Sequence, residues 1–172
     1  MSIRITRLSH AVALLLLAAG NTAASAQVVA GWQHESAAGV EFAFFSLSTA
    51  ELTVRCKGAA VEVVYYIDSA VLDPGLKGRG NAVFAVAIDD PTDIRWKSST
   101  LQAEPDVVSI GVGGADADRL AHDVANAQRG VVVGVYAVAP DASTPQYNTS
   151  QFPIYGAADA IKAAYAACGI KY

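Results

Sequence analysis

The chain has 172 residues, a formal net charge of −4 at pH 7, and hydrophobic side chains at 53% of its positions. An acidic balance disfavours binding that depends on phosphate contacts, so we expect neither a nucleic-acid partner nor attachment to an anionic membrane surface. This length predicts a single domain with one hydrophobic core.

Residues 1–26 have the features of an export signal. Arg4 and Arg7 give a positively charged start, and the apolar run at 11–19 is too short for a bilayer, which takes about 20 residues. Small residues up to Ala26 then form a cleavage site of the A-x-A type. An uncleaved N-terminal anchor is the alternative interpretation.

Cleavage after Ala26 predicts a single β-rich domain at residues 27–172. Asn21 stands where a lipoprotein would carry its cysteine, so we do not expect a lipid anchor. No second apolar run of spanning length follows, and we therefore expect a periplasmic or secreted protein without a membrane span.

The body of the chain is predicted to be mainly β. Apolar or alternating runs predict strands at residues 28–33, 40–47, 51–57, 61–67, 83–88, 94–98, 107–112 and 131–138. In ELTVRCK, the side chains of Leu52, Val54 and Cys56 share one face, as in a half-buried strand. Short connections predict an antiparallel meander from the second to the fourth strand.

Two stretches predict helices. Residues 117–128 place apolar side chains on one face, and we expect Asp116 to cap the start of this helix. Residues 152–168 predict an extended lead-in, a turn at Gly156, and an amphipathic helix that ends at Cys168. The expected fold class is α+β: an antiparallel β-sandwich or curled sheet, with one short internal helix and a C-terminal helix packed on it.

Cys56 and Cys168 are the two cysteines of the chain. In an exported protein, two cysteines predict one disulfide, with two buried free thiols as the alternative. Both cysteines lie on the core-facing side of their elements. A bond between them would pin the C-terminal helix against the strand that contains Cys56.

Residues 68–81 form a loop rich in glycine, in which Lys77 and Arg79 make the one compact basic spot of the sequence. Two interpretations remain open for this loop. It could meet an anionic ligand or an acidic partner, or it could be a solvated hairpin tip whose glycines satisfy turn geometry.

Two other stretches suggest ligand sites that their details do not support. Residues 89–93 hold three aspartates, but they lack the glycine and the glutamate of a calcium loop, so we predict a turn in which Asp side chains bond their own backbone. Residues 111–116 are rich in glycine, but Asp116 stands where a dinucleotide fingerprint needs glycine. We predict a glycine turn there.

Catalytic and metal-binding motifs are not found in the sequence. After residue 26 the histidines are His34 and His122, which are too far apart in sequence to show a metal-ligand spacing. We expect both to face solvent. Because GxSxG, HExxH and CxxC motifs are also missing, we predict no catalytic residue, metal or cofactor.

A series of structural motifs spans most of the predicted mature chain. The first is a Leu-x-x-x-Cys strand (Leu52, Cys56), and the second is an apolar strand that ends in Asp and is followed by a Trp (Val86–Asp89, Trp96). The third is a helix with a leucine, followed by an apolar strand (Leu120, Val131–Val138). The fourth is a Phe-x-x-x-Gly segment, followed by a helix and a Cys (Phe152, Gly156, Cys168). Their order resembles the small exported proteobacterial proteins of the VasI/TagO type, which are accessory proteins of type VI secretion. Ala87 and Ile88 stand where those proteins often carry an Arg before the Asp. The resemblance implies a periplasmic β-rich accessory protein without known catalysis.

Two classes of function therefore remain. The first is a non-catalytic periplasmic or secreted binding or assembly-accessory protein, which acts through protein–protein contacts with a partner in the cell envelope. The second is a small exported hydrolase, or an enzyme inhibitor, with a cleft that the sequence does not reveal. A flat apolar patch would favour the first class, and a partly buried cluster of titratable side chains would favour the second.

Overall fold

A computed structural model of the protein describes residues 31–139 and 149–172, so the predicted signal peptide lies outside the described residues. The described strands and helices confirm the predicted α+β class. In chain order they are β1 (Gln33–Ala37), β2 (Val40–Ser46), β3 (Ala50–Lys57), β4 (Ala60–Asp68), the 3-10 turn η2 (Pro74–Leu76), β5 (Asn81–Ile88), β6 (Ile94–Thr100), β7 (Gln102–Ala103), β8 (Val107–Gly113), α1 (Ala115–Asn126), β9 (Val131–Tyr136), β10 (Thr149–Phe152) and α2 (Ala157–Ala167).

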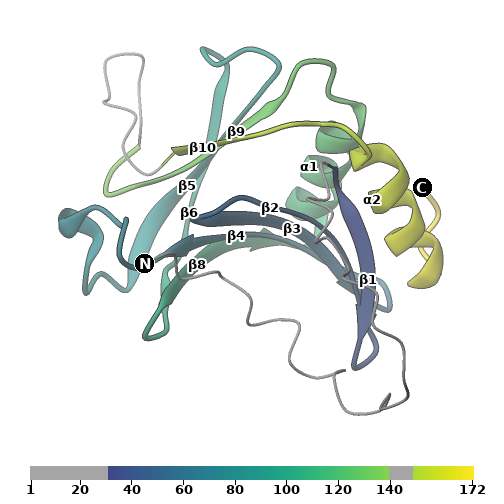
Figure 1. Cartoon of the computed structure of the whole chain (residues 1–172), viewed down its shortest axis with the longest axis horizontal. Helices are drawn as coiled ribbons and strands as arrows, with labels where there is room; N and C mark the ends of the chain where they lie inside the picture. The colour runs from purple at the N-terminus through teal and green to yellow at the C-terminus, as the bar shows by residue number, and fades with distance from the viewer. Residues whose placement is uncertain (1–30, 140–148) are drawn as a thin grey trace, which may run out of the picture.

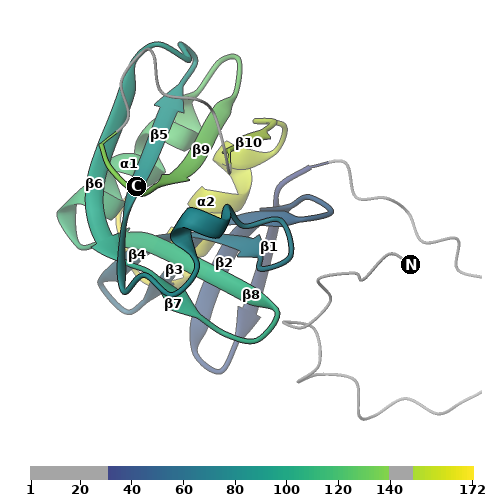
Figure 2. The same ribbon diagram turned by 90° about the vertical axis from the view of Figure 1, so that its left-hand side faces the viewer.

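The strands form two antiparallel sheets. Sheet A has the order β1-β2-β3-β4-β8-β7, and sheet B has the order β10-β9-β5-β6. The run from β2 to β4 is the predicted meander. Figure 1 shows sheet A as a bowed layer, with both helices and sheet B on the same side of it. Figure 2 shows β6, β5 and β9 side by side as the second layer.

One core lies between sheet A on one side and sheet B and the helices on the other. As the alternation in β3 predicted, Leu52, Val54 and Cys56 are buried. The ring of Phe152 packs edge-on against Phe45 and Tyr65, with ring centroids 6.4 and 6.1 Å apart. Aromatic side chains bury large apolar areas, so this group joins β10 firmly to sheet A.

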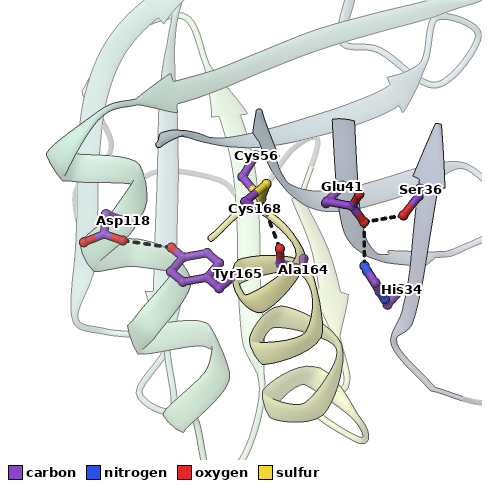
Figure 3. The surroundings of a disulfide bond; sticks show 8 residues. All are labelled: His34, Ser36, Glu41, Cys56, Asp118, Ala164, Tyr165 and Cys168. Carbon is purple, nitrogen blue, oxygen red and sulfur yellow. Dashed lines mark hydrogen bonds and ion pairs between the residues drawn. A yellow bond between two sulfur atoms is a disulfide. The ribbon is translucent and has the colours of Figure 1, made fainter. Parts of the chain in front are cut away.

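The predicted disulfide is present between Cys56 and Cys168, which lie 112 residues apart in sequence with their Cα atoms at 6.3 Å (Figure 3). Cys56 is buried in β3, and Cys168 is the C-cap of α2. The bond therefore holds the end of α2 across sheet A. Removal of such a bond from a small exported domain typically costs about 2–5 kcal/mol.

Asp89 joins the β5–β6 turn to the loop that follows α1. Its carboxylate accepts hydrogen bonds from the backbone N–H groups of Gln128, Arg129 and Gly130, at 2.6 to 3.3 Å. These bonds, those from Arg129 and Gln128 above all, hold the pKa of Asp89 below its ordinary value. We predicted that the aspartates of this turn bond their own backbone. The prediction is correct for Asp90, whose carboxylate accepts a hydrogen bond from the backbone N–H of Thr92. It is wrong for Asp89, which binds the distant loop instead.

The start of α1 and the glycine-rich stretch before it differ from the prediction. Helix α1 begins after Gly114 without a side-chain cap, and Asp116 lies in its first turn. Asp116 instead forms an ion pair with Lys97 of β6. Gly111 lies in β8, as the strand predicted at 107–112 requires, and Gly113 also belongs to β8 and not to the predicted turn; Gly114, with a φ of 65°, changes the chain direction.

The two ends of the sheets also differ from prediction. The first described strand begins at Gln33, so residues 31 and 32 of the strand predicted at 28–33 are not in a strand, and 28–30 lie outside the described residues. Strands β7 and β10 were not predicted, because both are short and β10 reads TSQF. Among the described helices, neither has the length and apolar character needed to cross a bilayer.

Candidate functional site

The predicted basic loop is well anchored. Leu72 and Leu76 are buried beneath it, and Nε of Arg79 donates to the carbonyl oxygen of Gly75 at 2.7 Å. Lys77 and Arg79 are both exposed on its surface. Since Arg79 already braces the loop, the solvated-tip interpretation explains this residue without a partner.

A histidine, a serine and a glutamate meet at β1 and β2, but not in the order that catalysis needs. Nε2 of His34 lies 2.9 Å from Oε2 of Glu41, and Oγ of Ser36 donates to the same oxygen (Figure 3). The hydrogen bond from Ser36 lowers the pKa of Glu41. The hydrogen bond and the charge interaction with His34 lower it further. In a nucleophile–base pair the histidine must accept the proton of the serine. Here both bind the carboxylate, so the group braces the β1–β2 edge.

The sequence predicted that His122 faces solvent, but in the structure its ring packs against other aromatic rings. Its ring stacks on that of Tyr172 at 4.3 Å and meets the ring of Tyr165 edge-on at 5.7 Å. The hydroxyl of Tyr165 donates to Asp118 at 3.0 Å (Figure 3), and burial, together with this carboxylate, raises the pKa of Tyr165. The aromatic rings thus join α1 to α2, and the missed signal was Tyr172, far away in sequence. His34, in contrast, is exposed as predicted.

Metal-ligating side chains do not gather in the part of the chain that the structure describes. No group of three or more His, Cys, Asp or Glu side chains is placed there to hold a metal ion.

A polar hollow lies on the outer face of sheet A, the face turned away from the helices. Its volume is about 280 Å³. We call it the β8 groove. The lining residues used below are Arg55, Glu62, Tyr66, Ser99, Thr100, Gln102, Glu104, Ser109, Gly111 and Gly113.

The β8 groove exists because one strand has almost no side chains on this face. Ser109, Gly111 and Gly113 alternate along β8 on the outer side, opposite Tyr66, Val64 and Glu62 of β4. The larger β4 side chains form one wall. Residues 99–104 form the other, where Oγ of Ser99 donates to the carbonyl oxygen of Gly111 at 2.5 Å.

Arg55 is held rigidly at one end of the groove. Its Nε and Nη2 atoms both donate to Oε2 of Glu62, at 2.6 and 2.5 Å, and Nη1 donates to the hydroxyl of Tyr66 at 3.3 Å. Burial raises the pKa of Tyr66; Arg55 opposes this shift and nearby carboxylates reinforce it, so the phenol keeps its proton at neutral pH. The groove thus presents a neutralised guanidinium beside a protonated phenol.

The outer face of sheet B is different in character. We call it the tryptophan face. The strand pairing places on this side of the sheet the apolar residues Val83, Ala85, Ala87, Ile94, Trp96, Val132 and Tyr136, together with the exposed polar residues Ser98 and Gln151. Trp96 is 52% exposed, and small side chains lie next to it. Val83, Ala85 and Ala87 are themselves buried, so the apolar surface that this face offers to solvent is chiefly the side chain of Trp96.

The orientation of Trp96 is fixed by its neighbours in β6. Arg95 and Lys97 form ion pairs with Asp123 and Asp116 of α1, on the core side of the sheet. Since successive side chains of a strand point to opposite faces, Trp96 points away from α1. Among the described elements, both helices lie on that other side (Figure 1).

Comparisons with known proteins found no matching family, no matching curated protein and no matching solved structure.

The sequence did not single out either outer face. It identified Trp96 only as part of a resemblance, and it interpreted the glycines of β8 as a turn. A signal for the tryptophan face was present, because VFAVAI and VVVGVY are continuous apolar runs, which are typical of strands buried on both faces.

Proposed function

We propose that the protein is a non-catalytic, exported binding or assembly-accessory protein that acts through protein–protein contacts in the cell envelope. The observation that carries this proposal is the exposed Trp96 on the tryptophan face. Tryptophan is enriched among the residues that dominate binding energy at interfaces. An apolar face of this kind on a folded domain favours a partner over solvent.

The pattern of β5 and β9 supports the same function. Alternate residues of these strands, such as Phe84 and Val133, fill the core, while Ala85 and Val132 lie on the outer face and are apolar as well. A strand with one face in water commonly carries polar residues on that face. Ala85 is already buried within the chain and Val132 is half-buried, so the part of this face that a partner would cover is chiefly the side chain of Trp96.

The test is quantitative capture of envelope proteins by the full exported chain and by its variant Trp96→Ser. The substitution removes most of the apolar surface that a partner would cover. We expect the captured partner to be lost from Trp96→Ser, while the melting temperature stays close to that of the wild type, because half of the indole is already in water.

Val71→Ser is the matched control. Val71 is 49% exposed, close to the value for Trp96, but it lies in the loop that follows β4. Capture by Val71→Ser should equal capture by the wild type. Equal loss in both variants would show adhesion to apolar side chains in general, and unchanged capture by Trp96→Ser would overturn the proposal.

A further inference from the structure

We propose that the β8 groove binds a neutral saccharide of one or two sugar units. This inference is independent of the proposed function, because the groove and the tryptophan face share no residue; Ser99 and Thr100, at the end of β6, are the groove residues that belong to sheet B.

The size of the groove sets the size of the ligand. Its volume of about 280 Å³ lies just below the range for small-molecule sites, which is roughly 300–1,000 Å³, so the ligand must be small. The outward positions from Ser109 to Gly113 run for roughly 14 Å along β8. A short, elongated ligand fits this shape.

The lining favours a ligand that both donates and accepts many hydrogen bonds. One wall offers the guanidinium of Arg55, the hydroxyl of Tyr66 and the carboxylate of Glu62, and the other offers Gln102 and Glu104, with serine and threonine hydroxyls between them. Carboxylates accept from ligand hydroxyls, while guanidinium and amide groups donate to them. The hydroxyl of Tyr66 accepts from Arg55, which leaves its own proton for another acceptor.

Charge excludes the main alternatives. Two carboxylates face one guanidinium, so the groove repels an anionic ligand. Glu62 is already paired with Arg55, which leaves Glu104 as the one lining carboxylate that Arg55 does not neutralise, at the other wall, for a cationic ligand. An extended peptide would seek backbone hydrogen bonds at a free sheet edge. Here β4 pairs with the whole of β8, β7 pairs with Val108 and Ser109 on its other side, and Ser99 takes the carbonyl oxygen of Gly111 beyond them. A neutral polyol matches what remains.

Two glycines in the groove floor have different reasons to be glycine. A Cβ on Gly111 would lie 2.3 Å from the carbonyl oxygen of Val63, so packing against β4 requires glycine there. A Cβ on Gly113 would have no neighbour closer than 3.8 Å, and its φ is not positive. The fold therefore tolerates a side chain at Gly113, and that side chain would enter the groove.

This difference supplies a clean experiment. Cellobiose, maltose and N,N′-diacetylchitobiose are titrated calorimetrically into the full exported protein and into Gly113→Leu. We expect at least one of the three to bind, and Gly113→Leu to weaken its binding by about tenfold or more. Gly80→Leu is the control, because Gly80 also has open space around its Cα but lies in the loop before β5.

A second variant protects the test against poor folding of Gly113→Leu. Tyr66→Phe removes one hydroxyl and leaves the ring, and it should weaken the same disaccharide about three- to tenfold. The proposal is overturned if none of the three disaccharides binds, or if Gly113→Leu and Tyr66→Phe bind as the wild type does. It is also overturned if only digalacturonic acid or a lysine-containing tripeptide binds.

Discussion

The outer faces of the two sheets are built on opposite plans. On sheet A, the face turned from the core carries Arg55, Glu62 and Tyr66 and is hollowed where β8 lacks side chains. On sheet B, the corresponding face carries Trp96 and Tyr136 above small apolar residues. Both sheets contribute to the same core, so the need to fold explains their inner faces and not this contrast.

The contrast teaches where to look for function in this molecule. A polar hollow with side chains fixed by one another suits a small polar ligand, since preorganised groups lose little freedom on binding. A sheet face with one large exposed aromatic side chain suits a protein partner. We therefore expect variants of one face to leave the other face's binding intact.

The largest expected effect is on the core that both faces share. Replacing both cysteines, Cys56→Ala with Cys168→Ala, should lower the free energy of unfolding by about 2–5 kcal/mol. Urea unfolding measures the loss, and alkylation of the non-reduced wild type should find no free thiol. Below its lowered melting point the variant should still bind through both faces. A variant that unfolds at the wild-type urea concentration would show that α2 is held without the bond.

The second effect concerns the tryptophan face alone. Trp96→Ser should weaken a captured partner by about 2 kcal/mol or more, roughly 30-fold, as for an interface hot spot. Trp96→Phe keeps an aromatic ring and should lose only part of that affinity. Surface plasmon resonance with the captured partner gives both values. If the two variants bind equally well, the aromatic side chain is not the anchor.

The third effect separates packing from ligand binding within the floor of the groove. Gly111→Ala forces a Cβ against the carbonyl oxygen of Val63 and should destabilise the fold by about 1–3 kcal/mol. Gly113→Ala should stay within about 0.5 kcal/mol of the wild type. Thermal melting of the pair decides between them. Equal melting temperatures would mean that β8 can shift, and the groove would then not be rigid.

The smallest effect is a pH dependence of stability that comes from Asp89, at the turn of the hairpin that carries Trp96. The folded pKa of Asp89 lies below its ordinary value, so its stabilising effect is full above about pH 4 and fades as pH falls through the folded pKa. Asp89→Asn should therefore be less stable than the wild type at pH 7, and the gap should narrow below pH 4. Urea unfolding across this range measures it, with Asp93→Asn as a control for the loss of one charge. If the difference in stability between the wild type and Asp89→Asn stayed constant with pH, the charge of Asp89 would not be its cause.

Alternation and cysteine placement predicted much of the core. ELTVRCK identified its buried face correctly because a period of two has one meaning in a half-buried strand, and the same parity placed Cys56 opposite the C-terminal helix. The strand β10, with the sequence TSQF, could not be found this way. Only Phe152 in it is buried, and its strand form comes from pairing with β9.

The two candidate surfaces were hidden for a related reason. Gly111 and Gly113 look like turn residues in a sequence, and only the partner strand shows that they are the floor of a groove. Trp96 lies in a strand with the sequence IRWKSST, whose charges suggest that the whole strand is solvated. The ion pairs of Arg95 and Lys97 with α1 reverse that view, because they place Trp96 on the outer side, between Ile94 and Ser98.

The most direct test of separate binding faces is site-specific photo-crosslinking in the cell envelope. A photoreactive phenylalanine analogue is placed at Trp96, at Val71 and at Gly113 in three otherwise identical full-length chains. The two-face account predicts one discrete protein adduct from position 96 and none of that size from positions 71 and 113. The same adduct from position 113, or from all three positions, would contradict it.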